Sequence, residues 1–431
     1  MNTSAQPMPA GSIPESEDRT YLSGRDSDPR ALGWMQGSPP PTDRRITFES
    51  DRSLNFPEIR WSLSHVRELV PTVGVRRGDG ARLSFGTPSA ADAAAIEALV
   101  FRDMDGRVRR FDQALFDTYA DGIIVLHRGR LVFERYFGAL EPHLPHACFS
   151  VTKSYAGTLA ATLVHEGAID DNKLIPHYLP ELRETGWADA TLRQVMDMQT
   201  GLDYREDDDD ARSTSSDYMR ACRTRPRQVG YDGPQTSCDY LRTVHKDGAH
   251  GEAFAYKSVN TQVMAWVLAR ATGRSFAQLL HERLWAPLSC EEDGYLIVDP
   301  AGMPSVSGGL CASLRDLARF GELIRREGEW DNKQLIPAPV IHDIRRGGDA
   351  AKFATATTVR LPGYSYRSQW WVSHNEIGAV EARGIHGQRL YVAPGAEMVI
   401  ARFGSQPMAS SAFSDPIIMP QMLALGNLLR G

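Results

Sequence analysis

The stretch Phe149-Ser-Val-Thr-Lys-Ser-Tyr155 opens an apolar run that extends from Ala156 to Leu163. A loop around Pro145 precedes it, Gly167 ends the pattern, and apolar side chains recur at intervals of four. This spacing predicts a helix from 150 to about 166 that is buried along one side. Ser150 then lies in the first turn, and Lys153 lies three residues further on the same face.

This placement indicates a possible nucleophile. A helix N-terminus has unpaired N–H groups that favour negative charge, and a nucleophilic serine needs a nearby base such as an amine. The chain has six lysines, and Lys153 is the only one with a serine three residues before it. The alternative is structural: Ser150 caps the helix, and Lys153 extends its amine to water.

Composition excludes several classes of function. The chain of 431 residues has a net charge of -6 and no basic tract, which argues against nucleic acid as a partner. No apolar run has the length of a membrane span, and the polar N-terminus shows no secretory signal. The five cysteines are odd in number and scattered, which fits a reducing cytoplasm and no metal site. Cys148 is expected to be a small buried residue.

The order of the predicted elements indicates an α/β plus all-α chain. Runs at 122–127 and 131–137 predict a β-hairpin, whereas 191–329 contains helical patterns and a long loop at 203–233. The expected helices are 192–198, 261–271, 276–284, 314–326 and 417–429, and the expected later strands are 369–372, 387–392 and 397–403. We expect a flexible leader at 1–45, a discontinuous α/β domain of 46–190 and 330–431, and an inserted α domain at 191–329.

Two further segments supply what a serine nucleophile needs. Tyr256 lies on a loop before a predicted helix, and a phenol beside cationic groups can take up and return a proton. Most tyrosines in such places only pack and hydrogen-bond. The segment 384–388, Gly-Ile-His-Gly-Gln, opens a strand, and its glycines let a backbone N–H approach a substrate. It can equally be a simple turn.

Together these segments resemble the serine β-lactamase and penicillin-binding-protein superfamily. Ser150-Val-Thr-Lys153 is similar to its Ser-x-x-Lys motif, Tyr256-Lys-Ser258 to its Tyr-x-Asn/Ser element, and Ile385-His-Gly387 takes the place of Lys-Thr-Gly. Within this superfamily, the sequences of 195–199 and 369–371 most resemble those of 6-aminohexanoate-dimer hydrolases, a group that also shows esterase activity. The resemblance implies a β-lactamase/transpeptidase-like fold, an antiparallel sheet flanked by helices with an inserted helical domain.

The same resemblance implies roles for individual residues. Ser150 forms an acyl-enzyme, Lys153 and Tyr256 share the proton transfers, and Ser258 bonds near Lys153. The N–H groups of Ser150 and Ile385 form the oxyanion hole. The implied substrate-binding residues are Ser258, Asp208, Asp217, Ser307, His386 and Gly387.

The chain departs from this family at several of these positions. Asp208 stands where the dimer hydrolases carry a tyrosine that contacts the substrate, and Ser307 stands in the place of an asparagine. Asp217 matches a loop acid only across a gap. The sheet-edge motif lacks a lysine, which argues against tight recognition of a β-lactam carboxylate.

Three smaller features have open interpretations. The acid run 206–210 is either a solvated loop or a rim that attracts cationic substrates. His386 either lines the pocket or fills a turn position. His143 and His146 have a loose metal-like spacing, but without a carboxylate cluster they are expected at the surface.

The predicted function is therefore a cytoplasmic serine hydrolase of small amides or esters, without cofactor or metal, acting as a monomer or homodimer. The alternatives are a D-peptidase, a weak β-lactamase, or a non-catalytic protein that binds peptidoglycan fragments.

Overall fold

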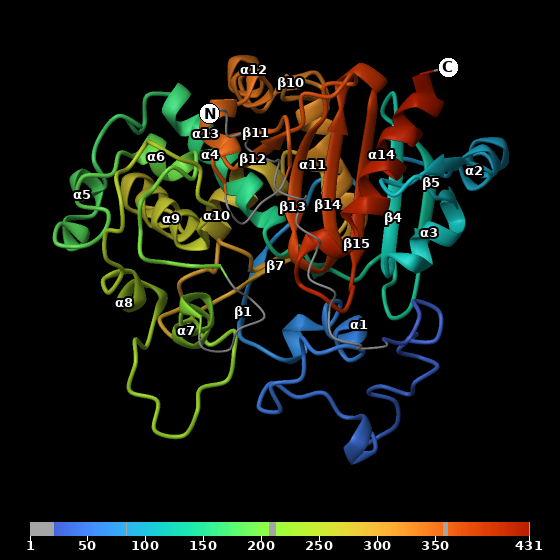
Figure 1. Cartoon of the computed structure of the whole chain (residues 1–431), viewed down its shortest axis with the longest axis horizontal. Coiled ribbons are helices and arrows are strands. Elements are labelled where there is room, and N and C mark those ends of the chain that lie inside the picture. Colours follow the sequence, from blue (N-terminus) through green and yellow to red (C-terminus); the bar gives the residue numbers. More distant parts are fainter. Residues whose placement is uncertain (1–20, 83, 207–212, 357–360, 431) are drawn as a thin grey trace, which may run out of the picture.

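A seven-stranded antiparallel sheet forms the centre of the computed structural model, which describes residues 21–82, 84–206, 213–356 and 361–430 (Figure 1). Its strands follow the order β11-β12-β13-β14-β15-β4-β5. They are β4 (Ala120–His127), β5 (Arg130–Tyr136), β11 (Ser365–Arg367), β12 (Trp370–Val372), β13 (Val380–Gly384), β14 (Gln388–Ala393) and β15 (Met398–Gly404). Because β15 pairs with β4, the C-terminal strands continue the sheet that the first hairpin begins.

The predicted hairpin is confirmed in β4 and β5. His127 pairs with Arg130 across the turn residues Arg128 and Gly129, which have φ angles of 51° and 75°. Two positive φ angles match the twist of the flanking strands in a two-residue hairpin turn. The strands predicted at 369–372, 387–392 and 397–403 are confirmed as β12, β14 and β15.

Strand β13 was not predicted, because its sequence hides the apolar pattern of a buried strand. Glu381 and Arg383 are both buried there, and they form an ion pair with a distance of 3.0 Å between Oε2 and Nη1. Since charged side chains of this kind are rarely buried without a partner, only the structure could reveal the strand.

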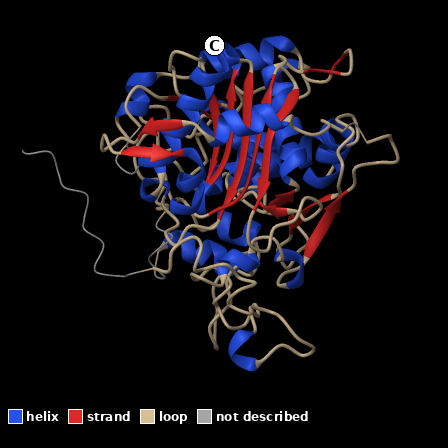
Figure 2. Ribbon diagram, turned by 90° about the vertical axis from the view of Figure 1, so that its right-hand side faces the viewer, coloured by secondary structure: helices blue, strands red, loops and turns tan. Residues whose placement is uncertain are grey.

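Different helices cover the two faces of the central sheet (Figure 2). Ile124 and Leu126 of β4 pack into one core with α4 (Val151–His165) and α11 (Leu314–Arg325). The alternate residues Ile123 and Val125 pack into a second core. That core includes side chains of α2 (Ala90–Glu97), α3 (Phe111–Asp117) and α14 (Asp415–Arg430). Strand β4 is therefore apolar on both faces, as a strand between two layers must be.

Helix α4 lies in the interior of the molecule. The predicted helix is confirmed, but the expectation of burial along one side is wrong, since every residue from 151 to 163 is buried. The reason is that α4 is enclosed between the sheet and helix α9 (Ser258–Thr272). At Gly157 an added Cβ would lie 2.0 Å from the carbonyl oxygen of Ser368, so only glycine fits there.

The remaining helices are α1 (Ile59–Ser62), α5 (Ile175–Tyr178), α6 (Leu192–Met196), α7 (Thr214–Ala221), α8 (Ser237–Leu241), α10 (Phe276–Leu280), α12 (Ala338–Arg346) and α13 (Ala350–Ala354). Several of these helices pack against α4 or α9, among them α5, α6, α8, α10 and α12. Single turns are η1 (Thr42–Arg44), η2 (Val66–Glu68), η3 (Pro180–Leu182), η4 (His281–Trp285), η5 (Ile385–Gly387), η6 (Pro394–Ala396) and η7 (Ser411–Phe413). Helix α7 lies within the predicted loop 203–233, where Ser213 caps it by accepting a hydrogen bond from the N–H of Ser216.

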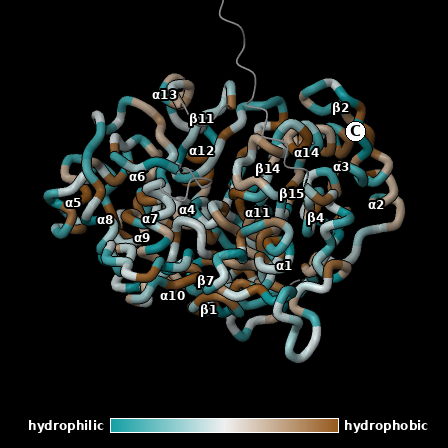
Figure 3. The backbone as a smooth tube through the Cα atoms, turned by 60° about the horizontal axis from the view of Figure 1, so that its bottom comes forward, coloured by the Kyte–Doolittle hydropathy of each residue, from teal (hydrophilic) through white to brown (hydrophobic). Residues whose placement is uncertain are grey.

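A second, four-stranded sheet leads into the site. Its order is β1-β7-β8-β6, with β1 (Thr72–Val75), β6 (His146–Ala147), β7 (Gly294–Ile297) and β8 (Leu310–Ala312). Strands β1 and β7 lie side by side in Figure 3. The two other small sheets are β2 (Val100–Arg102) with β3 (Val108–Arg110), and β9 (Glu329–Trp330) with β10 (Lys333–Gln334). Strand β6 ends three residues before Ser150, so this second sheet fixes the approach to α4.

The described part of the N-terminal segment is packed against the body. Trp34 is buried in a small core with Ile46, Trp61 and Ala139, whereas residues 1–20 of the predicted leader lie outside the described residues. The division into an α/β domain and an inserted α domain stays a prediction, although α11 of the predicted insert packs on the central sheet. Among the described residues, no helix is both long and apolar enough to cross a bilayer.

Candidate active site

The Ser150 hydroxyl is directed by a turn between β6 and α4. Phe149 has a φ of 44° and Ser150 occupies the N-cap position of α4. Within the described residues its hydroxyl makes no capping hydrogen bond; instead, the Nζ of Lys153 lies 2.8 Å from it and donates to Oγ. The serine therefore sits where a cap would, but its oxygen faces an amine.

The amine of Lys153 is withdrawn from water. The residue is only 1% exposed, and its Nζ also donates to the carbonyl oxygen of Ser307 at 2.5 Å. The expectation of a lysine that extends to solvent does not describe this side chain. The next residue, Gly308, lies beside the turn that carries Ser150, since its Cβ position would be 3.5 Å from the carbonyl carbon of Phe149.

Tyr256 approaches the same amine from the end of the loop before α9. The Nζ of Lys153 lies over the Tyr256 ring, 5.1 Å from its centroid. The ring also stacks on Trp371, with centroids 5.4 Å apart and planes inclined by 28°, and meets the edge of Tyr366 with centroids 6.4 Å apart. The structure thus brings Ser150, Lys153 and Tyr256 together, although a hundred residues separate the motifs in the sequence.

The sheet edge reaches the nucleophile at the end of β13. An added Cβ on Gly384 would lie 2.8 Å from the carbonyl oxygen of Cys148, so the two backbones are in direct contact. This contact places Ile385 beside the turn that carries Ser150. Among the described residues, the N–H groups of Ser150 and Ile385 have no backbone hydrogen-bond acceptor. Two such donors can stabilise a developing oxyanion.

His386 and Gly387 complete the turn after Ile385. His386 has a φ of 59°, its N–H donates to Ala409, and its Nδ1 lies 2.8 Å from the carbonyl oxygen of Gln406. Burial lowers the pKa of His386 to about 4, while the bond to Gln406 acts in the opposite direction. The imidazole is therefore neutral near pH 7 and bonded to the protein backbone, which favours the turn-filling interpretation. Gly387 has a φ of 95°, which favours glycine.

The other expected substrate-binding residues are less closely gathered. Ser307 is buried and contributes its carbonyl to Lys153. Ser258 is the first residue of α9, and its N–H donates to the carboxylate of Glu206. Asp217 is 54% exposed and pairs with Arg220 at 2.9 Å. Asp208 lies outside the described residues, as does the rest of the acid run after Glu206.

Two expectations about residues beside the site have clear outcomes. Cys148 is buried, as expected, and burial raises the pKa of its thiol well above the usual range. The surface position expected for His146 is wrong. Its ring is buried, stacks on Phe403 with centroids 4.5 Å apart, and has Nε2 3.3 Å from Asp121.

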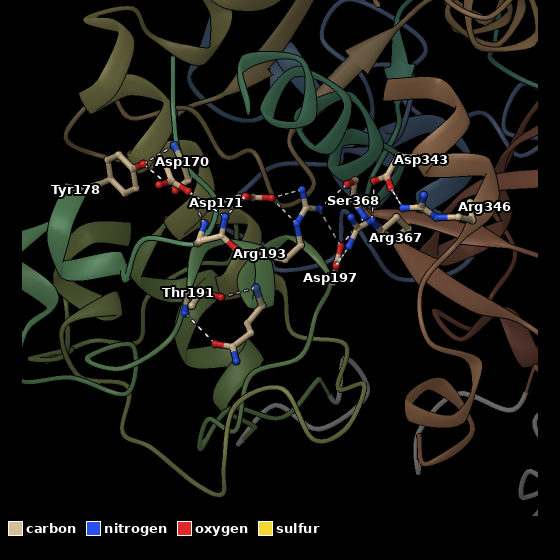
Figure 4. A network of polar contacts seen from close by, with 12 residues as sticks. Asp170, Asp171, Tyr178, Thr191, Arg193, Asp197, Asp343, Arg346, Arg367 and Ser368 are labelled. Atoms are coloured by element: carbon tan, nitrogen blue, oxygen red, sulfur yellow. Dashed lines mark hydrogen bonds and ion pairs between the residues drawn. The ribbon is translucent and has the colours of Figure 1, made fainter. Parts of the chain in front are cut away.

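Sequence reasoning missed the contacts that join the site to the helical region. Asp197, just after α6, accepts hydrogen bonds from Arg367 and from the N–H of Ser368, as Figure 4 shows. In Figure 4 the same network continues to Arg193 and Asp343. The sequence signal for this network was limited to charged residues, such as Asp197 and Arg367, next to apolar segments. Such residues do not indicate with which distant side chain they pair.

Comparison with known proteins identifies the family. Residues 109–415 match the family model described as Beta-lactamase. A 6-aminohexanoate-dimer hydrolase from Paenarthrobacter ureafaciens is 34% identical over 352 residues, which is 81% of this chain and 86% of that protein. The chain belongs to the β-lactamase family. As a β-lactamase family member it is a serine hydrolase that acts on amide or ester bonds.

Solved structures agree with this family fold. A Bacillus anthracis protein assigned to the 6-aminohexanoate-dimer hydrolases is similar with a TM-score of 0.80 and 31% identity, covering 88% of this chain and 96% of that one. A family VIII carboxylesterase, with a TM-score of 0.57 and 16% identity, covers 80% of this chain and 99% of its own. The second likeness shows the fold alone. The expected β-lactamase/transpeptidase-like fold is confirmed.

Proposed function

We propose that this enzyme hydrolyses small linear amides or esters through an acyl-enzyme on Ser150. The observation that carries the proposal is the position of the Lys153 amine, 2.8 Å from Ser150 Oγ and over the ring of Tyr256. A serine hydroxyl becomes nucleophilic when an adjacent base can take its proton. The relative from Paenarthrobacter ureafaciens is named as a 6-aminohexanoate-dimer hydrolase, which supports a linear amide as one substrate class.

In the proposed reaction, Ser150 Oγ attacks the carbonyl carbon of the substrate and its proton passes to the Lys153–Tyr256 pair. The carbonyl electrons move to the oxygen, which the N–H groups of Ser150 and Ile385 stabilise. When the tetrahedral intermediate collapses, the bond to the leaving amine or alcohol breaks, and Tyr256 returns the proton to it. A water molecule then attacks the ester on Ser150 and releases the carboxylic acid.

The finer assignments belong to the same proposal. Ser307 holds Lys153 through its carbonyl, and Ser258, Asp208 and Asp217 contribute to substrate binding. His386 supports the turn of the oxyanion hole, and Gly387 gives that turn its backbone shape. A cytoplasmic location is supported by five cysteines that are all free thiols. We expect a monomer or a homodimer.

A serine-directed phosphonate tests the proposal. Mass spectrometry should find one adduct on Ser150 in the native protein and none in Ser150→Ala. An unlabelled native protein would contradict the proposal and favour a member that only binds peptidoglycan fragments.

The preferred bond needs a separate comparison. Nitrophenyl acetate and butyrate should be compared with a linear ω-amino acid dimer, a D-amino acid dipeptide and a chromogenic β-lactam. We expect the esters and the linear amide to be cleaved faster than the β-lactam, because the sheet edge has Ile385 in the place of the lysine that would bind the carboxylate. Faster cleavage of the D-dipeptide would instead favour the D-peptidase alternative.

A further inference from the structure

The turn between β11 and β12 is a two-residue hairpin turn without glycine. Ser368 and Gln369 lie between the paired residues Arg367 and Trp370 and have φ angles of 46° and 64°. Two positive φ angles suit such a turn, but asparagine and glycine are the residues that usually adopt them. The contacts of Ser368 and Gln369 therefore show what holds this turn in place.

Asp197 fixes the turn from the helical side. Its carboxylate accepts the N–H of Ser368 at 2.8 Å and Nη1 of Arg367 at 2.7 Å. The Nη1 of Arg193 lies 3.4 Å from Oδ1 of Asp197, and Figure 4 shows the two side chains next to each other. Asp197 is buried, and charge-assisted hydrogen bonds of this type are stronger than neutral ones.

Gln369 connects the turn to the elements that carry the site. Its carbonyl oxygen accepts a hydrogen bond of 2.7 Å from Ser154, the residue that follows Lys153 on α4. Its side-chain Oε1 accepts one of 2.7 Å from Thr261 on α9, the helix that begins just after Tyr256. The turn therefore holds α4 and α9 at a set distance from each other.

Trp371 lies two residues after the turn and connects it to the phenol of Tyr256. Its indole stacks on Tyr256, with 5.4 Å between centroids. Other groups contact the same indole: the Tyr366 ring at 5.0 Å and the Arg383 guanidinium at 5.8 Å. Since Trp371 also pairs with Glu381 across the sheet, its own orientation is fixed by strand register.

We propose that Trp371 is a positioning residue that sets the tilt of the Tyr256 phenol toward Lys153 and Ser150. The inference rests on the proposed function, because it concerns the proton transfers of that same site. Trp371 acts through Tyr256: its indole is held by the Tyr366 ring and by the Arg383 guanidinium. A displacement of about 1 Å in such a site can lower the rate about 10²-fold.

Trp371→Met tests this role, because methionine keeps a flexible apolar side chain at this position but has no ring to stack on Tyr256. We expect kcat for nitrophenyl butyrate to fall about 10²-fold while KM changes less than about threefold. Trp371→Phe restores a ring and should return kcat to within about fivefold of the native value. The matched control is Phe353→Leu, since Phe353 contacts Trp371 from the same aromatic cluster. This control should lower the melting temperature and leave kcat unchanged.

A double-mutant cycle separates positioning from general support of the fold. If Trp371 acts through the phenol, Trp371→Met should cause little further loss of kcat in the Tyr256→Phe background. Additive losses, an unchanged kcat in Trp371→Met, or an equal loss in Phe353→Leu would each overturn the inference. If Trp371→Met does not fold, Trp371→Leu and Trp371→Phe are compared in the same cycle.

The phosphonate experiment distinguishes a failure of the positioning role of Trp371 from a failure of the proposed function. If native protein is labelled on Ser150 and Trp371→Met keeps its kcat, the positioning role fails and the proposed function stands. If native protein is not labelled, the proposed function itself fails.

Discussion

Lys153 and Arg319 are two basic side chains with similar burial and different surroundings. Lys153 is 1% exposed and Arg319 0%, and each lies over an aromatic ring: Nζ 5.1 Å from the centroid of Tyr256, and the guanidinium 4.7 Å from that of Phe85. Their hydrogen-bond acceptors differ in charge. Lys153 donates to a hydroxyl and a carbonyl, whereas Arg319 donates to the carboxylates of Asp316 and Glu291.

This difference is the one we expect between a group that transfers protons and a group that stabilises the fold. A cation held by carboxylates gains most when it stays charged, because taking both partners out of water is costly unless they compensate each other. A buried amine that donates to neutral oxygens can become uncharged, and then take up a proton, without leaving a carboxylate unpaired. The chain thus has an ion pair on α11, whereas on α4 it has the amine to which we assign the proton transfer.

The largest expected effect is on stability, in Arg319→Met. Removing the guanidinium leaves the buried carboxylate of Asp316 without its cation, which costs about 3 to 5 kcal/mol of the free energy of unfolding. Urea denaturation at pH 7, followed by circular dichroism, measures this loss. Activity per folded molecule should stay at the native value, since Arg319 contacts none of the proposed catalytic groups. A loss below about 1 kcal/mol would contradict the view that Arg319 stabilises the fold through its buried ion pairs.

The next effect is on turnover, in Lys153→Ala. We expect kcat to fall about 10²-fold or more, the usual contribution of a positioned acid–base group. The unfolding free energy should change less than in Arg319→Met, because the hydroxyl of Ser150 and the carbonyl of Ser307, which lose their donor, are neutral. The control is Lys333→Ala, which removes an exposed lysine from β10. Near-native turnover in Lys153→Ala would overturn the role of its amine.

Tyr256→Phe isolates the phenol oxygen. The ring stays stacked on Trp371 and under the Lys153 amine, so melting temperature should be close to native. We expect kcat to fall about 10²-fold if the oxygen transfers the proton. A kcat within twofold of native would leave Tyr256 as a packing residue only, which is the alternative its loop position also allowed.

The local motifs were predictable from the sequence because each depends on neighbouring residues. The helix after Ser150 follows from a periodic apolar pattern, and the hairpin of β4 and β5 follows from two apolar runs around a glycine turn. The assembly of Ser150, Lys153 and Tyr256 was predicted from a family resemblance. No periodicity in the chain places residue 256 beside residue 153.

The support of the site could not be predicted, because it depends on pairings between distant segments. Asp197 and Ser368 are 171 residues apart. The left-handed turn at Ser368 contains no glycine that would predict it from the sequence. Strand β13 was hidden by Glu381 and Arg383, which neutralise each other in the interior. Charged residues in a sequence are normally assigned to the surface, so buried pairs of this kind are found only in the structure.

The smallest effect tests the comparison on a third buried side chain, the imidazole of His386. Its acceptor is the neutral carbonyl of Gln406, and burial lowers its pKa to about 4 from 6.5. The unfolded chain therefore binds the proton at higher pH than the folded protein, so the stabilisation is fully present above about pH 6.5 and is lost as the pH falls toward 4.

His386→Asn should remove this dependence and keep the backbone, because asparagine tolerates a φ near 59°. Between pH 7 and pH 5 the native protein should lose about 2 kcal/mol more unfolding free energy than the variant. Urea denaturation at both pH values measures the difference, and titrations common to the two proteins cancel. Equal losses would mean that His386 is not a buried neutral base. A neutral acceptor would then not be enough to keep a buried group uncharged in this protein, and the contrast between Lys153 and Arg319 would need another cause.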